Sequence, residues 1–413
     1  MIYDLIIIGG GAAGLCCAIN VKRRISNSKI LIFEALPRVG KKLAATGNGR
    51  CNITNLRITD GSYHGKEPSF AEYALKKYEY NVCRDFFYSI GVPFISEGDK
   101  VYPASLQAAS VVDALRFEAD GLGIETLTEH KVDGLDFSSD TFTVKCKNEA
   151  YRSKSLLVAA GLLSGGDKFG CNGSILGLMC EKGYKKVALS PSIVQVRTEN
   201  DTVKQLKGIK VTAKAAIRKN GNIMRTEYGE VLFCDYGLSG PPILQLSRLV
   251  SVPDGKSEIV LDLMPDVDYS RLFDTLKERA VMLKTRKLEE FFTGMLNKRL
   301  GQVIIKTCGL KLADTVSTLN EKSIKAITSK IKSFTFKVTG TTGFINSQAT
   351  AGGLSTPLFD SRTMMSKIHN GLFAAGEILD IDGDCGGFNL QWAWSSSMCA
   401  ADGICKLLKG NTE

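Results

Sequence analysis

Apolar and polar positions at the start of the chain follow a pattern typical of a strand, a tight turn and a helix. Residues 5–8 form an apolar run of strand length, residues 9–14 have the spacing Gly-x-Gly-x-x-Gly, and residues 15–19 continue as a good helix opening. A second run at 29–33 is apolar on both faces, as a buried parallel strand should be, and it ends at Glu34. This order of elements predicts a Rossmann-type α/β domain.

Further apolar patterns extend this domain along the chain. Periodic apolar positions predict helices over residues 70–88 and 108–119. Alternating runs predict a hairpin over residues 131–137 and 141–147, which we expect to cross one edge of the domain. Residues 156–161 are again apolar and end in small residues, so we expect a buried strand whose end lets a cofactor come close.

The pattern changes around Pro191 to short strands separated by turn signals such as Asn220-Gly221, and we expect strands over residues 193–197, 209–217, 223–228, 231–234 and 259–263. A Lys-rich helical pattern follows over residues 268–332, and residues 334–338 return as a strand. The expected core positions of the helical part are Leu272, Leu276, Leu283, Leu296, Ile304, Ile324, Ile327 and Ile331. We therefore expect a Rossmann-type α/β domain interrupted by an insertion. The expected parts are the α/β domain at 1–188 and 353–413, an inserted β-rich domain at 189–266 and 333–352, and a helical subdomain at 267–332.

The glycines of the first turn each have a physical task. Gly9 allows the tight turn, Gly11 lets the backbone approach a pyrophosphate, and Gly14 lets the helix lie close to the strand. The amides and dipole at the helix start favour an anion. Glu34 lies 20 residues beyond Gly14, where an acid can accept hydrogen bonds from ribose hydroxyls. These residues predict a site for an adenine dinucleotide.

Composition narrows the class of protein without identifying a ligand. The chain has 413 residues, of which 44% are hydrophobic and 23% charged, as in ordinary soluble proteins. Its net charge is +10, and because Lys and Arg residues occur all along the sequence, we expect them mostly on solvated faces. Twelve cysteines occur without a Cys-x-x-Cys, so reduced thiols and a cytoplasmic location are expected, and no apolar run is long enough to span a membrane. With only three histidines, we expect no metal site and no histidine-based triad.

A second segment, residues 46–55, is rich in small and amide side chains. Such a loop can lie flat against a planar ring system, and Arg50 can meet a phosphate or a substrate anion. The alternative, a polar surface loop without a ligand, remains open on residue types alone. The preceding Gly-Lys-Lys at 40–42 lacks the other residues of a Walker sequence.

Three motifs in the same order resemble the aminoacetone oxidase family of FAD-binding flavoproteins, also called BaiN-like. They are Gly-Gly-Gly-Ala-Ala-Gly-Leu at 9–15, Thr-Gly-Asn-Gly-Arg-Cys-Asn-Ile-Thr-Asn at 46–55, and the glycine-rich run within 371–393. The resemblance covers most of the chain. It implies a two-dinucleotide-binding-domain flavoprotein fold, with the inserted β-rich domain and the small helical domain, and it places residues 46–52 at the isoalloxazine.

The C-terminal motif resembles the second FAD fingerprint. In that fingerprint an apolar strand ends in Ala-Gly-acid and the acid holds a ribityl hydroxyl; Glu377 takes that place. The amino end of the following helix, from about 389 to 409, can face the flavin pyrimidine edge and stabilise the reduced state. The alternative is a calcium loop of Asp380, Asp382 and Asp384, but the later Glu of an EF-hand is absent.

The motifs and the resemblance together give the expected FAD-binding residues. They are Gly9, Gly11, Ala12, Ala13, Gly14, Glu34, Ala35, Lys42, Thr46, Gly47, Asn48, Gly49, Arg50, Cys51, Asn52, Ala160, Gly161, Gly376, Glu377, Gly386, Gly387, Phe388, Asn389 and Leu390. No residue is assigned as general acid or base; the candidates near the ring are Arg50, Cys51, Asn52 and Asp235.

The chain departs from the family pattern on the substrate side. Cys234-Asp235-Tyr236 stands where relatives often carry Thr-His, Ser355-Thr356-Pro357 stands where an acid is common, and Ala160 stands where Thr is usual. Because of these departures, we do not assign the substrates of the family members to this chain.

The expected function is that of an FAD-dependent oxidoreductase with hydride transfer through flavin N5. Only one Gly-x-Gly-x-x-Gly with its acid occurs, so NAD(P)H is expected to visit only transiently as a donor. The resemblance implies a small unsaturated or keto compound as the substrate that is reduced. One alternative is an amine oxidase that acts on an aminoacetone-like substrate with oxygen as acceptor. An RNA-binding or RNA-modifying flavoprotein ranks below it, because no basic stripe with interleaved aromatic residues is evident in the sequence. A non-catalytic FAD-binding protein is a further alternative.

Overall fold

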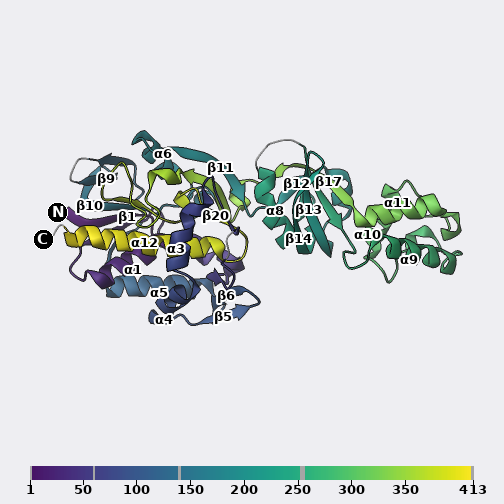
Figure 1. Ribbon diagram of the computed structural model, residues 1–413, viewed down its shortest axis with the longest axis horizontal. Coiled ribbons are helices and arrows are strands. Elements are labelled where there is room, and N and C mark those ends of the chain that lie inside the picture. The colour runs from purple at the N-terminus through teal and green to yellow at the C-terminus, as the bar shows by residue number, and fades with distance from the viewer. Residues whose placement is uncertain (1, 59–60, 138–140, 252–255, 411–413) are drawn as a thin grey trace. The chain divides into compact units, whose positions relative to one another are not determined.

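The computed structural model describes residues 2–58, 61–137, 141–251 and 256–410, and the chain divides into two compact units (Figure 1). The first unit comprises Met1–Ser192 and Phe344–Glu413, and the second comprises Ile193–Gly343. The expected boundaries at 188 and 352 lie a few residues away, because strand β11 (Lys186–Ser192) pairs with β18 (Ala349–Leu354) inside the first unit.

The first unit is built on a seven-stranded sheet whose parallel core contains the predicted strands. Strand β1 (Ile2–Ile8) lies between β2 (Ile30–Phe33) and β10 (Glu149–Val158), and it is parallel to both. β19 (Leu372–Ala374) pairs in parallel with β10, and β7 (Glu125–Leu127) with β2. Because these strands are parallel, the segments that follow β1, β2, β10 and β19 all emerge at one edge of the sheet.

An antiparallel extension completes this sheet. It consists of β9 (Phe142–Cys146), which pairs with β10, and β8 (Gly134–Phe137), which pairs with β9. β8 and β9 form the predicted hairpin. The unit also contains short elements, namely the strands β3 (Thr54–Asn55), β4 (Tyr63–His64), β5 (Phe94–Glu97), β6 (Lys100–Pro103) and β20 (Asp382–Gly383) and the helices α2 (Lys41–Ala44) and α6 (Ser174–Glu181).

Helices α1 (Ala12–Arg24), α5 (Ala108–Gly121) and α12 (Phe388–Gly410) cover the parallel core, and α1 lies alongside α12 (Figure 1). Most of α12 is buried, including Trp392 and Trp394. The Trp392 indole donates a hydrogen bond to the Gly376 carbonyl at 3.1 Å, which joins α12 to the segment after β19. The C-terminal helix is therefore part of the core and not an appendage.

The prediction of one continuous helix over residues 70–88 is wrong. The structure has α3 (Glu72–Lys77) and α4 (Tyr80–Ser89), with a break at Tyr78. The Tyr78 carbonyl accepts hydrogen bonds from Gln391 Nε2 at 2.7 Å and from Ser395 Oγ at 2.8 Å, both on α12. A carbonyl engaged by another helix no longer needs an intrahelical partner, so the break is compensated by tertiary contacts.

The second unit contains a closed barrel with the strand order β12-β15-β14-β13-β16-β17. Its strands are β12 (Val196–Thr198), β13 (Lys210–Lys219), β14 (Asn222–Phe233), β15 (Gly237–Ser239), β16 (Ser257–Asp262) and β17 (Phe334–Thr341). Residues 223–228 and 231–234 were expected as two strands, but they form the single strand β14. The reason is that its pairing with β13 continues through Gly229 without interruption.

Helices α7 (Asn200–Gln205), α8 (Pro241–Ser251), α9 (Tyr269–Met282), α10 (Lys298–Thr307) and α11 (Glu321–Lys332) belong to the same unit. Asp268, Asn297 and Asn320 cap α9, α10 and α11 by accepting hydrogen bonds from amides of the first turn. Of the predicted helical core positions, Leu272, Leu276, Ile304, Ile324, Ile327 and Ile331 are buried, whereas Leu283 and Leu296 are partly exposed. None of the helices in the described ranges has the length and apolar character required to cross a lipid bilayer.

Candidate functional site

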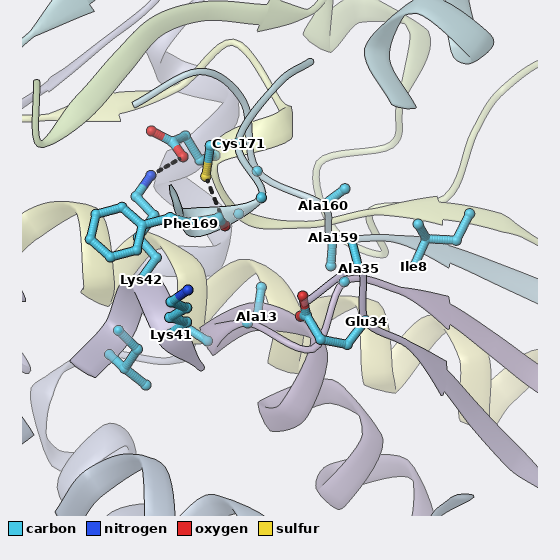
Figure 2. Close-up of a pocket in the computed structure, with 18 of the residues that line it drawn as sticks. Ile8, Ala13, Glu34, Ala35, Lys41, Lys42, Ala159, Ala160, Phe169 and Cys171 are labelled. Atoms are coloured by element: carbon cyan, nitrogen blue, oxygen red, sulfur yellow. Dashed lines mark hydrogen bonds and ion pairs between the residues drawn. The ribbon is translucent and has the colours of Figure 1, made fainter. Parts of the chain in front are cut away.

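A pocket lies at the edge of the sheet where β1, β2, β10 and β19 end (Figure 2). It holds about 1400 Å³ of space not filled by atoms, counting the part open to solvent. Its walls come from segments that are far apart in the sequence, including the first glycine turn, Glu34, the ends of β10 and β19, and the start of α12. The parallel topology brings together the segments that follow β1, β2, β10 and β19.

The three glycines of the first turn play different parts in the pocket wall. A Cβ on Gly9, whose φ is +110°, would lie 2.5 Å from the Ala159 carbonyl oxygen. A Cβ on Gly14 would lie 2.0 Å from the Gly9 carbonyl oxygen. A Cβ on Gly11 would meet nothing within 4 Å, and Gly11 lines the pocket. Gly9 and Gly14 therefore permit the turn, whereas Gly11 leaves a backbone surface open to a ligand.

Glu34 follows β2 and lies in the pocket wall near Ala13 and Ala35 (Figure 2). Its carboxylate accepts hydrogen bonds from the Leu36 amide at 2.8 Å and from the Gly10 amide at 3.1 Å. Burial raises the pKa of Glu34 above its usual range, and the backbone hydrogen bonds offset this only in part. The two amides hold the carboxylate against the glycine turn.

Lys42 and Glu377 form an ion pair on another wall of the pocket. The Lys42 ammonium lies 2.6 Å from the Glu377 carboxylate, as the dashed line at Lys42 in Figure 2 marks. Glu377 also accepts hydrogen bonds from Ser164 Oγ at 2.6 Å and from the Thr350 amide at 2.8 Å. Burial lowers the pKa of Lys42, but the Glu377 carboxylate more than offsets this, so the pKa is raised.

The loop at residues 46–52 contributes only Thr46 to the pocket lining. Cys51 has a φ of +57° and is fully buried. The Arg50 guanidinium pairs with Glu97 and lies 4.3 Å from the centre of the Tyr102 ring, so it is directed to the β5–β6 hairpin. Asn52 Oδ1 is buried and has no hydrogen-bond partner among the described residues.

The loop meets the C-terminal glycines directly. Asn55 Nδ2 donates a hydrogen bond to the Gly386 carbonyl at 2.8 Å. A Cβ on Gly387 would lie 2.4 Å from the Thr54 carbonyl oxygen and 2.9 Å from Asn52 Oδ1. Two of the sequence motifs, more than 300 residues apart, are thus side by side at the start of α12.

The pocket brings together fourteen of the residues expected at FAD. They are Gly9, Gly11, Ala12, Ala13, Glu34, Ala35, Lys42, Thr46, Ala160, Gly161, Gly376, Glu377, Asn389 and Leu390. The others lie outside its lining: Gly14, Gly47, Asn48, Gly49, Arg50, Cys51, Asn52, Gly386, Gly387 and Phe388.

Asp235, the remaining candidate, belongs to the second unit. Its exposed carboxylate pairs with Lys207 at 2.7 Å, and the hydrogen bond from Lys207 lowers the pKa of Asp235.

The pocket also contains segments that the sequence analysis did not assign to it. They are residues 130–132, residues 169–175 and Gln348. The glycines at 170 and 173, both with φ near +71°, were a turn signal that could have indicated the second of these segments. Burial raises the pKa of the Cys171 thiol to about 11, against the opposite influence of Lys42.

The three acids considered as a calcium loop do not act together. Asp380 accepts a hydrogen bond from the Lys66 amide at 2.8 Å, and Asp382 accepts one from Ser192 Oγ at 3.2 Å. The Asp384 carboxylate lies 2.7 Å from His64 Nε2. No cluster of three or more metal-ligating side chains is found in the part of the chain that the structure describes.

Comparison with known proteins agrees with this geometry. The model of the HI0933-like protein Rossmann domain matches residues 3–403. The 3-dehydro-bile acid delta(4,6)-reductase of Clostridium scindens is 30% identical over 95% of this chain and 97% of its own length. The ribosomal RNA dihydrouridine synthase of Haemophilus influenzae is 28% identical over 96% of this chain and 97% of its own length.

Among solved structures, a quinol-fumarate reductase with menaquinol molecules superposes with a TM-score of 0.51 at 16% identity, covering 98% of this chain and 71% of that one, and this likeness supports the fold. Since the family model spans nearly the whole chain and a relative of 30% identity covers 95% of it, the protein belongs to the HI0933-like Rossmann-domain family and is an FAD-dependent oxidoreductase.

Proposed function

We propose that this protein uses FAD to reduce a carbon–carbon double bond conjugated to a carbonyl group in a small organic substrate, with NAD(P)H as a transient hydride donor. The name of the Clostridium scindens relative describes a reductase that acts on such bonds of a 3-keto bile acid. The observation that carries the proposal is the pocket itself, which joins the first glycine turn and Glu34 to the segment after β19 and the start of α12.

The residues of the pocket fit FAD. Gly11 exposes backbone at the start of α1, where a pyrophosphate would be held by amides and the helix dipole. Glu34 is an acceptor for ribose hydroxyls. Bound FAD supplies hydride transfer at N5.

The protein's own groups prepare the site for that chemistry. The Glu377 carboxylate favours the charged form of Lys42 in the pocket wall, and Ser164 and the Thr350 amide hold that carboxylate in place. The amino end of α12 lines the pocket through Asn389 and Leu390, and a helix start favours a negative charge that builds on reduction. NAD(P)H is proposed as a visiting donor because the sequence holds one complete dinucleotide fingerprint.

Glu34→Gln is expected to remove a pH dependence of FAD binding. In the native protein the affinity of the apoprotein for FAD should fall as the pH decreases through the raised pKa of Glu34, because a protonated carboxyl is a poorer acceptor. The variant should bind FAD about tenfold more weakly at neutral pH, the value of one charged hydrogen bond, and without that pH dependence. Flavin fluorescence quenching measures both.

The stability of the apoprotein should respond in the opposite direction. The folded chain binds this proton more tightly than the unfolded chain, so Glu34 contributes more stability as the pH falls through its raised pKa. Glu129→Gln, an exposed position outside the pocket lining, is the matched control. An unchanged pH profile in Glu34→Gln would remove Glu34 from the proposed site.

The proposed function is tested by anaerobic titration of the FAD-loaded protein with NADH and with NADPH, followed by addition of a 3-keto-4-ene steroid. We expect the oxidised-flavin absorbance to disappear with one equivalent of nucleotide and to return when the conjugated ketone is added. If neither nucleotide reduces the flavin while aminoacetone does so, the reductase proposal fails and the amine oxidase alternative replaces it.

A second candidate shares the same bond chemistry. Two relatives, 28% and 27% identical over nearly the whole chain, are named ribosomal RNA dihydrouridine synthase. Formation of dihydrouridine is also the saturation of a double bond conjugated to a carbonyl. Addition of an unmodified ribosomal RNA transcript to the reduced protein, with analysis of the product for dihydrouridine, distinguishes this substrate from the steroid.

A further inference from the structure

The positive charge of the chain is concentrated in one of its two units. Residues 193–343 contain 25 Lys and Arg against 16 Asp and Glu, whereas the rest of the chain contains 28 against 27. Nine of the ten excess positive charges therefore lie in the second unit, although the cations alternate with other residues along the sequence. A charge separated in this way indicates an anionic partner for that unit.

Helix α10 (Lys298–Thr307) presents part of this charge. Leu300, Val303 and Ile304 are buried, and the opposite positions Lys298, Arg299 and Lys306 are exposed. The helix contains no acidic residue. Its hydrophobic side is therefore used in the core of the unit, and its basic side faces solvent.

Helix α7 extends the basic side of α10. The two helices lie next to each other, and the Arg299 guanidinium donates a hydrogen bond to the Lys207 carbonyl just beyond α7. Lys204 on α7 is exposed. We call this surface the α7–α10 basic face; it consists of Lys204, Lys207, Lys298, Arg299 and Lys306 (α10 is labelled in Figure 1).

The charges on this face are largely available to a ligand. Lys207 pairs with Asp235, but Lys204, Lys298 and Lys306 have no carboxylate within 4.0 Å among the described residues. Asp201, at the start of α7, is the exposed acid nearest in sequence to Lys204. Unpaired, solvated lysines at a helix surface can replace the counterions of a phosphate backbone without first breaking an ion pair.

The character of the face favours a nucleic acid over a lipid surface. The large exposed hydrophobic side chains of the second unit, such as Tyr228, Val281 and Met282, belong to other elements, and none lies on α7 or α10 within the described residues. Binding to a membrane interface usually combines basic and apolar groups, whereas binding to phosphate backbones requires cations alone. The relatives named ribosomal RNA dihydrouridine synthase extend over this segment as well.

We propose that the α7–α10 basic face binds the phosphate backbone of RNA. The proposal concerns RNA binding only and does not depend on whether RNA is the substrate that the flavin reduces. Lys204, Lys298 and Lys306 supply the contacts to phosphate oxygens, and Arg299 keeps α10 attached to the end of α7 through the Lys207 carbonyl.

The test compares the full-length protein with the triple variant Lys204→Gln, Lys298→Gln, Lys306→Gln. The probe is a fluorescently labelled RNA hairpin, and binding is followed by anisotropy over a series of salt concentrations. We expect the Kd of the variant to rise about tenfold or more, and the slope of log K against log salt to decrease by about 2, since each lost phosphate contact reduces it by roughly 0.7 to 0.9.

The matched control is Lys76→Gln, Lys147→Gln, Lys406→Gln, which removes the same charge from exposed positions of the first unit. Its RNA affinity should stay within about twofold of the native value, because the contacts of the basic face are retained. Equal losses in both variants would overturn the proposal, and so would native protein that binds vesicles containing phosphatidylserine but not the RNA.

Two readouts separate this proposal from the proposed function. FAD content and flavin reduction by NAD(P)H should be the same in the triple variant and the native protein, because none of the three lysines lies in the pocket lining. A native protein that binds the hairpin but is not reduced by nucleotide would contradict the proposed reaction alone. A protein that is reduced normally but binds no RNA would contradict the basic face alone.

Discussion

Gly14→Ala is expected to destabilise the protein and to abolish FAD binding. In an ordinary helix interior this substitution stabilises by about 1 kcal/mol, because alanine has the higher helix propensity. Here the new Cβ would lie 2.0 Å from the Gly9 carbonyl oxygen and 3.2 Å from the Ile7 side chain. Strand β1 and helix α1 would have to separate, at a cost of about 3 kcal/mol, in the upper part of the range for overpacked cores. Urea denaturation of the apoprotein measures this loss.

Two other glycines provide controls for the Gly14 experiment. Gly177 lies in α6 with open space around the position of a Cβ, so Gly177→Ala should raise stability by up to about 1 kcal/mol. Gly11→Ala also meets no protein atom within 4 Å, so the apoprotein should keep its stability. Its FAD affinity should nevertheless fall about 100-fold, or about 2.7 kcal/mol, because the methyl group points into the proposed pyrophosphate site. Full FAD affinity in Gly11→Ala would contradict that site.

Lys42→Met is expected to have the second largest effect. The substitution keeps the length of the side chain but leaves the Glu377 carboxylate in the pocket wall without its cation. Removing one partner of a fully buried pair costs about 3–5 kcal/mol. Since the side chains of Lys42 and Glu377 retain 30% and 19% exposure, we expect a smaller loss of about 2 kcal/mol in the stability of the apoprotein. Chemical denaturation gives this value.

The pH dependence of the stability loss in Lys42→Met tests whether the Lys42–Glu377 ion pair is its cause. Because the pKa of Lys42 is raised in the folded state, its contribution is complete below the usual lysine pKa of about 10.4 and is lost as the pH rises through the raised value. The difference between Lys42→Met and the native protein should thus be constant around neutral pH and should shrink in strong alkali.

A double-mutant cycle completes the Lys42 experiment. Adding Glu377→Gln to Lys42→Met should recover part of the lost stability, because the unpaired charge is removed. Lys41→Met is the control, because Lys41 is exposed and has no carboxylate within 4.0 Å among the described residues. This substitution should change stability by less than about 0.5 kcal/mol. Additive losses in the double variant would show that Lys42 and Glu377 are not coupled.

The two proposals assign separate tasks to the two units. The first unit contains the whole of the pocket, and its net charge is close to neutral. The second unit carries the excess positive charge and a barrel whose strands enclose a hydrophobic core of its own. Reduction of a conjugated double bond and binding of a polyanion can therefore be altered independently by mutation.

Much of the first unit could be predicted from local sequence. β1, the glycine turn, α1 and β2 occur as expected, because apolar runs, glycine spacing and helix propensity act over only a few residues. Glu34 and the segment at Gly376-Glu377 also lie where the motifs place them, in the same pocket. The FAD-dependent oxidoreductase class follows from these motifs and is confirmed by the family match.

Other features depended on partners that are distant in the sequence. The break at Tyr78 arises because Gln391 and Ser395 donate hydrogen bonds to its carbonyl, and β14 is continuous across Gly229 because its pairing with β13 continues there. Arg50 was expected to meet a phosphate or a substrate anion, but its neighbours in the structure are Glu97 and Tyr102. Arg50 has several polar groups within reach in the folded chain. The sequence around Arg50 does not indicate which of these groups it contacts.

The sequence by itself determined the α/β class, the dinucleotide turn with its acid, and the presence of a β-rich insertion with a helical part. These properties are encoded in residues that are neighbours along the chain. The tertiary structure alone decided that Glu377 is held by Lys42, Ser164 and the Thr350 amide, and that Asn52 Oδ1 is left without a partner. It also placed α7 and α10, each with exposed lysines, next to each other. Each of these arrangements depends on the crossing of distant segments, which local propensities do not encode.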